Sequence, residues 1–493
     1  VALTRIFTPP QGFAAAQCIF QILQERPPGG QELKRVLGPV HLTMLGVGAI
    51  VGAGIFALVG TAAAGNADRL GAGPAIVASF ALTGLACTFT ALCYAELAAL
   101  VPISGSAYTY SYATLGEIIA WIIGWDLILE YAVGNVAVAV SWSGYYCELL
   151  RGFGWEFPRY LAVDLQTARS DPAILAEAPR ILGVPLVFNL PAVVIVTVIT
   201  WVLLLGIRES AWFNAAMVMV KLLVLGLFVG VGMFYIRPEN WTPFAPNGWA
   251  GIQSGAAVVF FAFIGFDAVS TTAEECRNPK RDLPIGILAS LGVCTAIYVI
   301  VAAVLTGMVS WQNLNTAEPL SVAMRVADLD WAAGIIAFGS VVAHTAVLFV
   351  FQLGQPRILL SMARDGLLPK AFARVHPRFH TPHRATILTG LFVGAGSALA
   401  SLEEMADLCN IGTLSAFLIV CVGVLVLRYR DPARPRPFRT PWVPVVPVLG
   451  VIACLYLMAG LPREAWIRFG VWLVVGFICY AVYGRRRSRL AAR

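Results

Sequence analysis

Long apolar stretches separated by short polar segments run through most of the chain. Many of them approach the roughly 20 residues that a helix needs to cross a bilayer. We expect twelve membrane-spanning helices, at 42–64, 74–100, 117–148, 189–206, 212–235, 252–272, 286–309, 332–361, 385–401, 408–428, 443–460 and 465–484. The third and eighth predicted spans are longer than a bilayer requires, which predicts tilt or extension beyond it.

Two predicted spans contain residues that should interrupt a helix. Span 1 has a glycine-rich stretch, Gly46–Gly54, and each glycine costs roughly 1 kcal/mol relative to alanine inside a helix. Span 6 has an interrupted stretch, Phe260–Asp267. In hydrocarbon, broken backbone is tolerated only where it is buried in protein or lines a cavity. A pair of broken spans in corresponding positions of two halves indicates a transporter binding site.

The spacing of these two breaks predicts the fold. An odd number of spans separates their starts, so the second five-helix unit is inserted upside down relative to the first. We therefore expect an all-α membrane protein with a five-plus-five inverted repeat and two extra C-terminal helices. The predicted parts are a cytoplasmic N-terminal segment with a surface helix (1–39), a transport core (40–428, repeats 40–236 and 250–428), spans 11 and 12 (442–484) and a basic cytoplasmic tail (485–493).

Composition agrees with a polytopic membrane protein. The chain is 59% hydrophobic and 12% charged, whereas soluble domains carry about 25% charged residues. Its net charge of +7 does not indicate nucleic-acid binding, because the basic residues fall in short loops. Most of the 34 Lys and Arg residues lie on the side that holds both termini, which predicts cytoplasmic termini in the plasma membrane.

An enzyme and a channel are the alternative classes. The chain has no metal-spaced His and Cys set, P-loop or nucleophile elbow, so we expect no catalytic residue, metal or cofactor. A channel would favour a ring of polar groups along one pore. The twice-broken, inverted pattern fits alternating access better. The lipid bilayer is therefore an expected partner, and nucleic acid is not.

Several motifs, in their order along the chain, carry a family resemblance. They are Gly-Ala-Gly-Ile-Phe (52–56), Val-Pro-Ile-Ser-Gly-Ser-Ala-Tyr-Thr-Tyr (101–110), the stretch from Phe260 to Ile287, Ser361–Pro369 and Asn410–Ser415. With them the chain resembles the amino acid–polyamine–organocation transporters, and within these the cationic amino acid transporter subfamily in its bacterial form. The resemblance covers nearly all of residues 35–480 and implies the fold already expected from the glycines.

The broken spans suggest how an amino acid zwitterion would be held. The first amides of a half-helix attract a carboxylate, and the resemblance assigns this role to Gly52, Ala53 and Gly54. Carbonyl groups freed by the breaks suit the ammonium, and we expect them at Ile50 in span 1 and at Phe261, Ala262 and Ile264 in span 6. The alternative is that these small residues only permit close helix packing.

Substrate size is expected to depend on span 8. In such a transporter span 8 faces the same cavity, where Phe351 or Gln352 would set the pocket size. Because no clear acid lies at the expected side-chain end, we predict a small neutral L-amino acid such as alanine. A cationic substrate, arginine or lysine, or amino acid exchange is the alternative.

Lys221 lies near the middle of span 5. Along a helix it is about 20 Å from Arg208 and about 24 Å from Arg237, and a charge at that depth costs roughly 2.5–3.5 kcal/mol. In proton-coupled relatives, a span-5 lysine amine occupies the place of a sodium ion, so the resemblance implies proton coupling. We expect Lys221 and Glu130, its best candidate partner, to be the proton-coupling residues. A fixed structural ion pair of Lys221 with Glu130 or Asp126 is the alternative.

Overall fold

The computed structural model describes residues 37–66, 69–101, 106–181, 183–206, 211–377, 379 and 381–487. Most of the predicted N-terminal segment (1–39), with its surface helix, lies outside these described residues, as does most of the basic tail (485–493). Part of the motif at 101–110 is also outside them.

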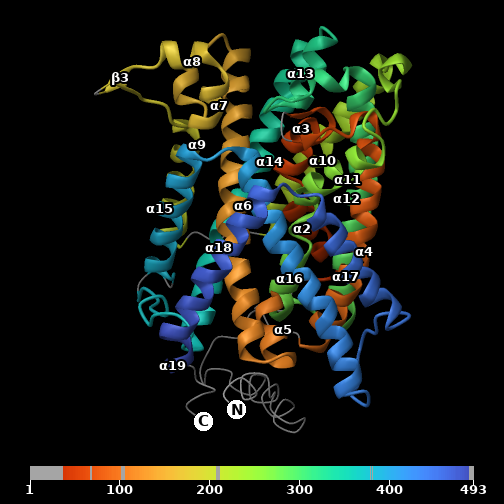
Figure 1. Cartoon of the computed structure of the whole chain (residues 1–493), viewed down its shortest axis with the longest axis vertical. Helices are drawn as coiled ribbons and strands as arrows, with labels where there is room; N and C mark the ends of the chain where they lie inside the picture. Colours follow the sequence, from red (N-terminus) through yellow and green to blue (C-terminus); the bar gives the residue numbers. More distant parts are fainter. Residues whose placement is uncertain are drawn as a thin grey trace.

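An elongated bundle of helices forms the described chain (Figure 1). Its main helices are α2 (Pro39–Ile50), α3 (Val59–Ala64), α4 (Ile76–Leu100), α6 (Glu117–Gly152), α9 (Leu190–Leu204), α10 (Ala211–Gly232), α11 (Gly248–Val259), α12 (Pro279–Met308), α14 (Asp330–Arg364), α15 (His383–Leu399), α16 (Leu402–Arg430), α17 (Val445–Ala459) and α18 (Arg463–Cys479). The predicted long third and eighth spans are the 36-residue α6 and the 35-residue α14.

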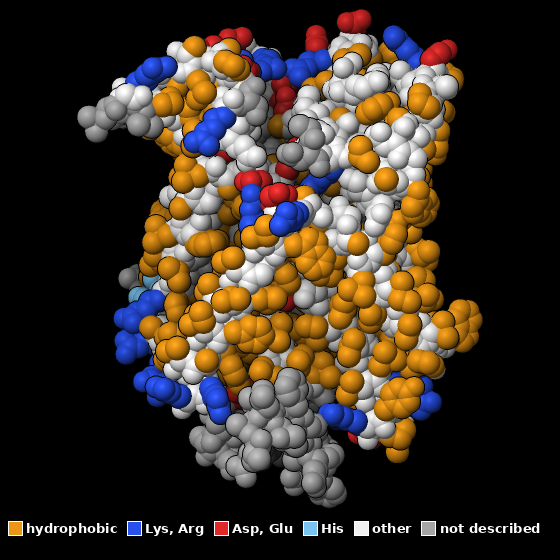
Figure 2. Space-filling view, viewed as in Figure 1, with side chains coloured by type: hydrophobic (Ala, Val, Ile, Leu, Met, Phe, Trp, Pro, Cys, Tyr) orange, Lys and Arg blue, Asp and Glu red, His pale blue; other side chains and the backbone are white. Residues whose placement is uncertain are grey.

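The described residues include eight helices that are long and apolar enough to cross a membrane, or nine if the bent pair Pro39–Ile50 and Gly54–Ala64 is one span. Two shorter apolar helices, α9 and α17, accompany them. Hydrophobic side chains cover much of the middle of the face in Figure 2, and charged side chains lie mainly toward its ends. The protein is therefore an all-α, multi-pass membrane protein, and its described residues add two short hairpins to the helices.

Burial separates central helices from peripheral ones. In α6, 83% of the most apolar stretch is buried inside the protein, whereas in the last helix, Arg463–Arg487, only 17% is buried. α6 packs against α14 and α16, while α12 packs against α4 and α2. α2 also packs against α10, and the short turn Phe260–Phe263 packs against α4 and α16. The last helix presents apolar side chains outward.

Small elements close the two ends of the bundle. At one end lie α7 (Leu165–Ser170), α8 (Pro172–Glu177), α13 (Pro319–Val326) and the hairpin of β3 (Arg180–Ile181) with β4 (Val184–Pro185) (Figure 1). We call this the α13 end. A second hairpin pairs β1 (Gly65–Asn66) with β2 (Arg69–Leu70). At the opposite end, the α5 end, lie α5 (Ser106–Thr114) and α19 (Arg485–Arg487).

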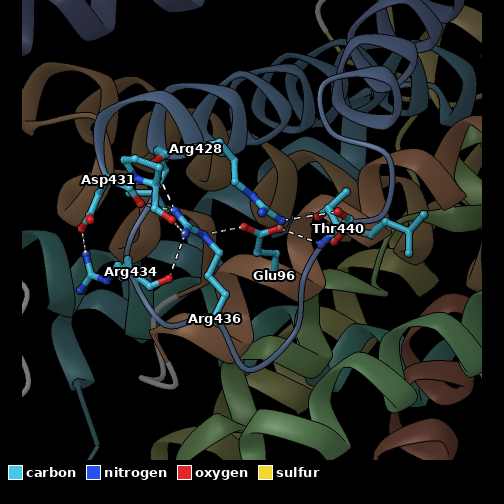
Figure 3. Close-up of polar contacts among 9 residues, drawn as sticks. Glu96, Arg428, Asp431, Arg434, Arg436 and Thr440 are labelled. Atoms are coloured by element: carbon cyan, nitrogen blue, oxygen red, sulfur yellow. Dashed lines mark hydrogen bonds and ion pairs between the residues drawn. The ribbon is translucent and has the colours of Figure 1, made fainter.

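A buried ion cluster fastens α4 to the segment that follows α16 (Figure 3). The Glu96 carboxylate accepts from Arg428 at 2.8 Å and from the amide of Thr440 at 2.7 Å, and it forms an ion pair with Arg436 at 3.1 Å. The Arg436 guanidinium also donates to the carbonyls of Leu427 and Asp431 at the end of α16. A buried carboxylate and a buried guanidinium are thus paired by charge, and the guanidinium also satisfies carbonyls at the end of a helix.

Candidate functional site

Predicted span 1 is broken where its glycines indicate. α2 ends at Ile50, a π-helical segment begins at Gly54, and the two halves are bent by 47°. The chain turns over Gly52, whose carbonyl accepts from the amides of Ile55 and Phe56 at 3.2 and 3.3 Å. A helix end leaves backbone groups without intrahelical partners, so this break frees carbonyls on one side and amides on the other.

Lys221 of α10 reaches the freed carbonyls of the first half. Its side chain is fully buried, and its ammonium donates to the carbonyl of Gly48 at 2.6 Å and to that of Val51 at 3.0 Å. Its electrostatic neighbours include His344 and Cys294. Backbone carbonyls of an unwound segment are the groups that hold a small cation in broken-helix transporters. Here a side-chain cation lies against them.

Two tyrosines that the sequence analysis did not single out complete the support of the break. The Tyr298 hydroxyl of α12 donates to the Ile50 carbonyl at 3.0 Å, and the Tyr145 hydroxyl of α6 donates to the Phe56 carbonyl at 2.5 Å. A buried tyrosine hydroxyl usually finds an acceptor. Tyrosine within an apolar span was thus the available signal, although it does not say which carbonyl would accept.

The two broken segments touch each other. A Cβ placed on Gly54 would lie 2.2 Å from the Ala262 Cα, and one on Gly265 would lie 2.9 Å from the Ala49 carbonyl oxygen. The φ angle of Gly265 is +116°, which few residues other than glycine adopt. The second break therefore needs glycine for its backbone shape, and the first needs it for close approach. The two glycines together allow the two breaks to pack against each other.

The other predicted site residues of these segments are buried beside this contact. Gly52 faces Val347 of α14, which a Cβ on Gly52 would approach to 3.0 Å. Ala53, Phe261 and Ile264 are also buried, and the Phe261 carbonyl accepts from the Ile264 amide at 3.3 Å. The structure thus gathers the predicted residues of spans 1 and 6.

Phe351 lies on the α6 side of α14. Its ring centroid is 5.3 Å from that of Tyr131, and a Cβ on Gly134 would approach its ring to 3.0 Å. Gln352 points elsewhere, because its side-chain amide contacts Asn135 and donates to the Thr200 hydroxyl at 3.0 Å. Of these two candidates, Phe351 therefore packs on the aromatic Tyr131, and Gln352 makes polar contacts that join α14 to α6 and α9.

Glu130 has a different environment from Lys221. It is buried in α6, its backbone carbonyl accepts from the Cys409 thiol at 3.5 Å, and its electrostatic neighbours include Asp267 and Asp126. Asp267 follows the break of predicted span 6. The grouping of these three acids was missed by the sequence analysis, because the rotation of α6 about its axis cannot be deduced from apolar periodicity alone. These three acids form a second set of ionisable side chains beside the broken segments.

The residues that precede α13 cover the second half of predicted span 1 at the α13 end. A Cβ on Gly60 would lie 2.1 Å from the Leu314 carbonyl oxygen, and the Thr61 hydroxyl bonds the Asn315 side chain at 3.3 Å. Glu318, which precedes α13, has its pKa raised to about 7 by burial and by the nearby Glu148 carboxylate, against the opposing effect of Arg325. Arg325 itself bonds Glu148 at 2.6 Å.

Comparison with known proteins agrees with this architecture. The family model described as amino acid permease matches residues 37–482, which includes both breaks, Lys221 and Phe351. The chain belongs to the amino acid permease family. It is a transporter of the amino acid–polyamine–organocation superfamily and not an enzyme.

Two bacterial relatives cover nearly all of the permease. It is 47% identical to the branched-chain amino acid permease BcaP of Bacillus subtilis, over 94% of this chain and 96% of the relative. It is 44% identical to the methylthioribose transporter of the same organism, over 93% and 95%. The vacuolar cationic amino acid transporter 2 of Arabidopsis thaliana is 41% identical over 83% of this chain, which spans 62% of that longer protein.

Proposed function

We propose that the permease carries a small neutral L-amino acid, such as alanine, across the plasma membrane by alternating access and is driven by protons. The contact of Lys221 with the carbonyls of Gly48 and Val51 carries this proposal. A cation built into the protein at the break makes a sodium ion there unnecessary. A lysine amine can release its proton where an arginine cannot. Protonation would therefore form this contact, and deprotonation would break it.

The proposed substrate site lies at the contact between the two breaks. The amides of Gly52, Ala53 and Gly54 would bind the carboxylate, and carbonyls of Phe261, Ala262 and Ile264 would accept from the ammonium. The Ile50 carbonyl, which already accepts from Tyr298, has a second lone pair for the same role. The proximity of Gly54 to Ala262 supports this assignment, since one zwitterion must reach both segments.

Phe351, packed against Tyr131, would limit the substrate side chain. Glu130 would act as a second proton-carrying group, together with the acids beside it. This role is supported by its burial and by its electrostatic contact with Asp267, which follows the break of span 6. A proton held there would be coupled to the movement of that half-helix.

For the whole chain we propose twelve spans, with inverted repeats 40–236 and 250–428 and two further spans within 442–484. The described helices α9, α15 and α17 would be the shortest spans. Both termini and the α5 end would face the cytoplasm. The basic residues of the segments 277–281, 357–384 and 428–439 support this orientation, since cytoplasmic loops are enriched in Lys and Arg.

A branched-chain amino acid is the second candidate substrate, and the 47% identity to BcaP favours it. Purified permease in proteoliposomes with an imposed pH gradient tests the proposal, with alanine, leucine, arginine and methylthioribose as substrates, with and without sodium. We expect alanine uptake that follows the pH gradient and needs no sodium. Sodium-dependent uptake would contradict proton coupling, and leucine uptake well above that of alanine would establish the second candidate. Counterflow of labelled alanine distinguishes a carrier from a channel.

A further inference from the structure

A cavity of about 270 Å³ lies between the start of α12 and the segment that joins α16 to α17. From α12 it is lined by Lys280, Arg281, Ile285 and Leu288, and from the connecting segment by Pro437 and Phe438. The cavity is far from the Lys221 contact in sequence, and none of its residues takes part in the proposed transport mechanism.

The mouth of the cavity is basic. Lys280 and Arg281 are exposed in the first turn of α12, whose amide groups add a positive helix end. The residues that line the cavity include no acid. Arg439, which directly follows Phe438, is exposed as well. The positive charge at the mouth of the cavity therefore suits an anion such as a phosphate group.

The deeper wall is apolar and continues along the membrane-facing side of α12. Ile285 is 39% exposed, and Val293 and Ile300, two and four turns further along, are 43% and 49% exposed. Leu288 lies between them and is partly exposed. A ligand whose phosphate meets Lys280 and Arg281 could therefore lay an acyl chain along α12. A soluble phosphate compound would leave this apolar stripe unused.

The opposite wall is held rigidly. Pro437 and Phe438 directly follow Arg436, whose guanidinium is fixed by Glu96 and by carbonyls at the end of α16 (Figure 3). The cavity wall is thus built before a ligand arrives, which lowers the entropic cost of binding.

We propose that this cavity binds the headgroup of an anionic phospholipid, with an acyl chain along α12. In the proposed orientation the lipid comes from the cytoplasmic leaflet. Basic pockets between membrane helices on that side bind anionic headgroups in other proteins. The bound lipid would bridge the start of α12, which follows broken span 6, and the segment fastened to α4 by Glu96.

Native mass spectrometry of the full-length protein in neutral detergent tests this. Phosphatidylglycerol and phosphatidylcholine with identical acyl chains are titrated into the parent, the double variant Lys280→Gln/Arg281→Gln, and the control Arg485→Gln/Arg486→Gln, which removes the same charge from the same end. We expect the parent to prefer phosphatidylglycerol by roughly ten- to thirtyfold, since each basic residue near an anionic headgroup contributes about 1 kcal/mol. The cavity variant should lose most of this preference and the control should keep it.

Equal loss in both double variants would show that general surface charge, and not the cavity, selects the lipid, and would overturn the proposal. A further variant, Ile285→Gln, keeps the charge and should weaken phosphatidylglycerol binding; unchanged binding would contradict the acyl-chain path. Inorganic phosphate and glycerol 3-phosphate are added as competitors. If either displaces the lipid at equal concentration, the cavity is a site for a soluble anion and the lipid assignment is wrong.

Discussion

The Lys221 ammonium lies 2.6 Å from the Gly48 carbonyl oxygen, inside the end of the first half of a broken helix. Gly48 lies two residues before Ile50, the last residue of α2. Val51 follows Ile50, and its carbonyl accepts from the same ammonium. One side chain of α10 thus satisfies two backbone groups that the break would otherwise leave unpaired in a membrane. Any movement of α2 away from α10 must break these bonds. Loss of the proton from the ammonium would weaken them, because charged donors form stronger hydrogen bonds.

Replacement of Lys221 should separate coupling from binding. Lys221→Ala removes the switchable cation, so we expect it to lose pH-driven accumulation while keeping some substrate binding or exchange. Lys221→Arg should fail as well, because arginine stays charged throughout the accessible pH range. Uptake into proteoliposomes with an imposed pH gradient measures both. Met219→Ala, at a half-exposed position on the same helix, is the control and should transport like the parent.

Two outcomes would oppose this account. Full pH-driven uptake by Lys221→Ala would show that the proton is carried elsewhere. Activity of Lys221→Arg equal to that of the parent would show that a permanent charge is enough, and would make Lys221 a fixed structural group.

Gly54 should tolerate no side chain. A single methyl group there would lie 2.2 Å from the Ala262 Cα, and overpacking of this kind costs about 1–3 kcal/mol. We therefore expect Gly54→Ala to lower alanine uptake at least about tenfold, and Gly54→Leu or Gly52→Leu to abolish it, in protein that is still inserted and folded. Gly226→Ala, where a Cβ meets no atom within 4 Å, is the matched control. Normal transport by well-folded Gly54→Leu would place the substrate site elsewhere.

Phe351 should restrict the size of the substrate. Phe351→Ser removes the ring that packs on Tyr131, so larger or cationic amino acids should bind more tightly to the variant than to the parent. Thermal-shift titrations with alanine, leucine and arginine measure this selectivity. Phe338→Ser, at a 56% exposed position of the same helix, should leave it unchanged. An unaltered ranking in Phe351→Ser would mean that this ring only packs α14 against α6.

Local signals explain what the sequence predicted well. The glycines of 46–54 and a charge at 221 stand out within apolar stretches, and neither observation depends on how the helices pack. Both the break of span 1 and the isolated position of Lys221 could therefore be predicted. The interruption predicted at Phe260–Asp267 contains Gly265, whose positive φ angle is a local requirement too.

Contacts between distant helices could not be predicted in this way. The bond from Tyr298 to Ile50 joins residues 248 positions apart, and aromatic residues are common in membrane helices. The surroundings of Glu130 depend on how α6 is rotated against α16 and the end of span 6. Because α6 is buried on nearly all sides, its apolar pattern does not distinguish one face from another.

Glu318 should make the stability of the protein depend on pH. Its pKa is raised to about 7, above its ordinary value near 4.5, so between these pH values the folded protein holds a proton that the unfolded chain has lost. By linkage, the free energy of unfolding then falls as pH rises from about 4.5 to about 7 and this contribution is constant above that. Thermal unfolding of Glu318→Gln should lack this part of the pH dependence. Glu239→Gln, at an exposed position in the short 3-10 helix Pro238–Trp241, should keep it. Identical profiles for the parent and Glu318→Gln would contradict the assignment.

Glu96 should be essential for stability at the α5 end. Its buried carboxylate joins Arg428, Arg436 and the amide of Thr440 (Figure 3). Glu96→Ala would leave the Arg436 guanidinium buried without its carboxylate, and breaking one partner of a buried pair costs about 3–5 kcal/mol. We therefore expect a clear fall in the unfolding temperature in detergent. Arg434→Ala removes a more exposed pair with Asp431, 3.8 Å apart, and should change it little, because surface pairs contribute about 0–1 kcal/mol. If both variants unfold like the parent, the cluster does not fasten α4 to the segment after α16.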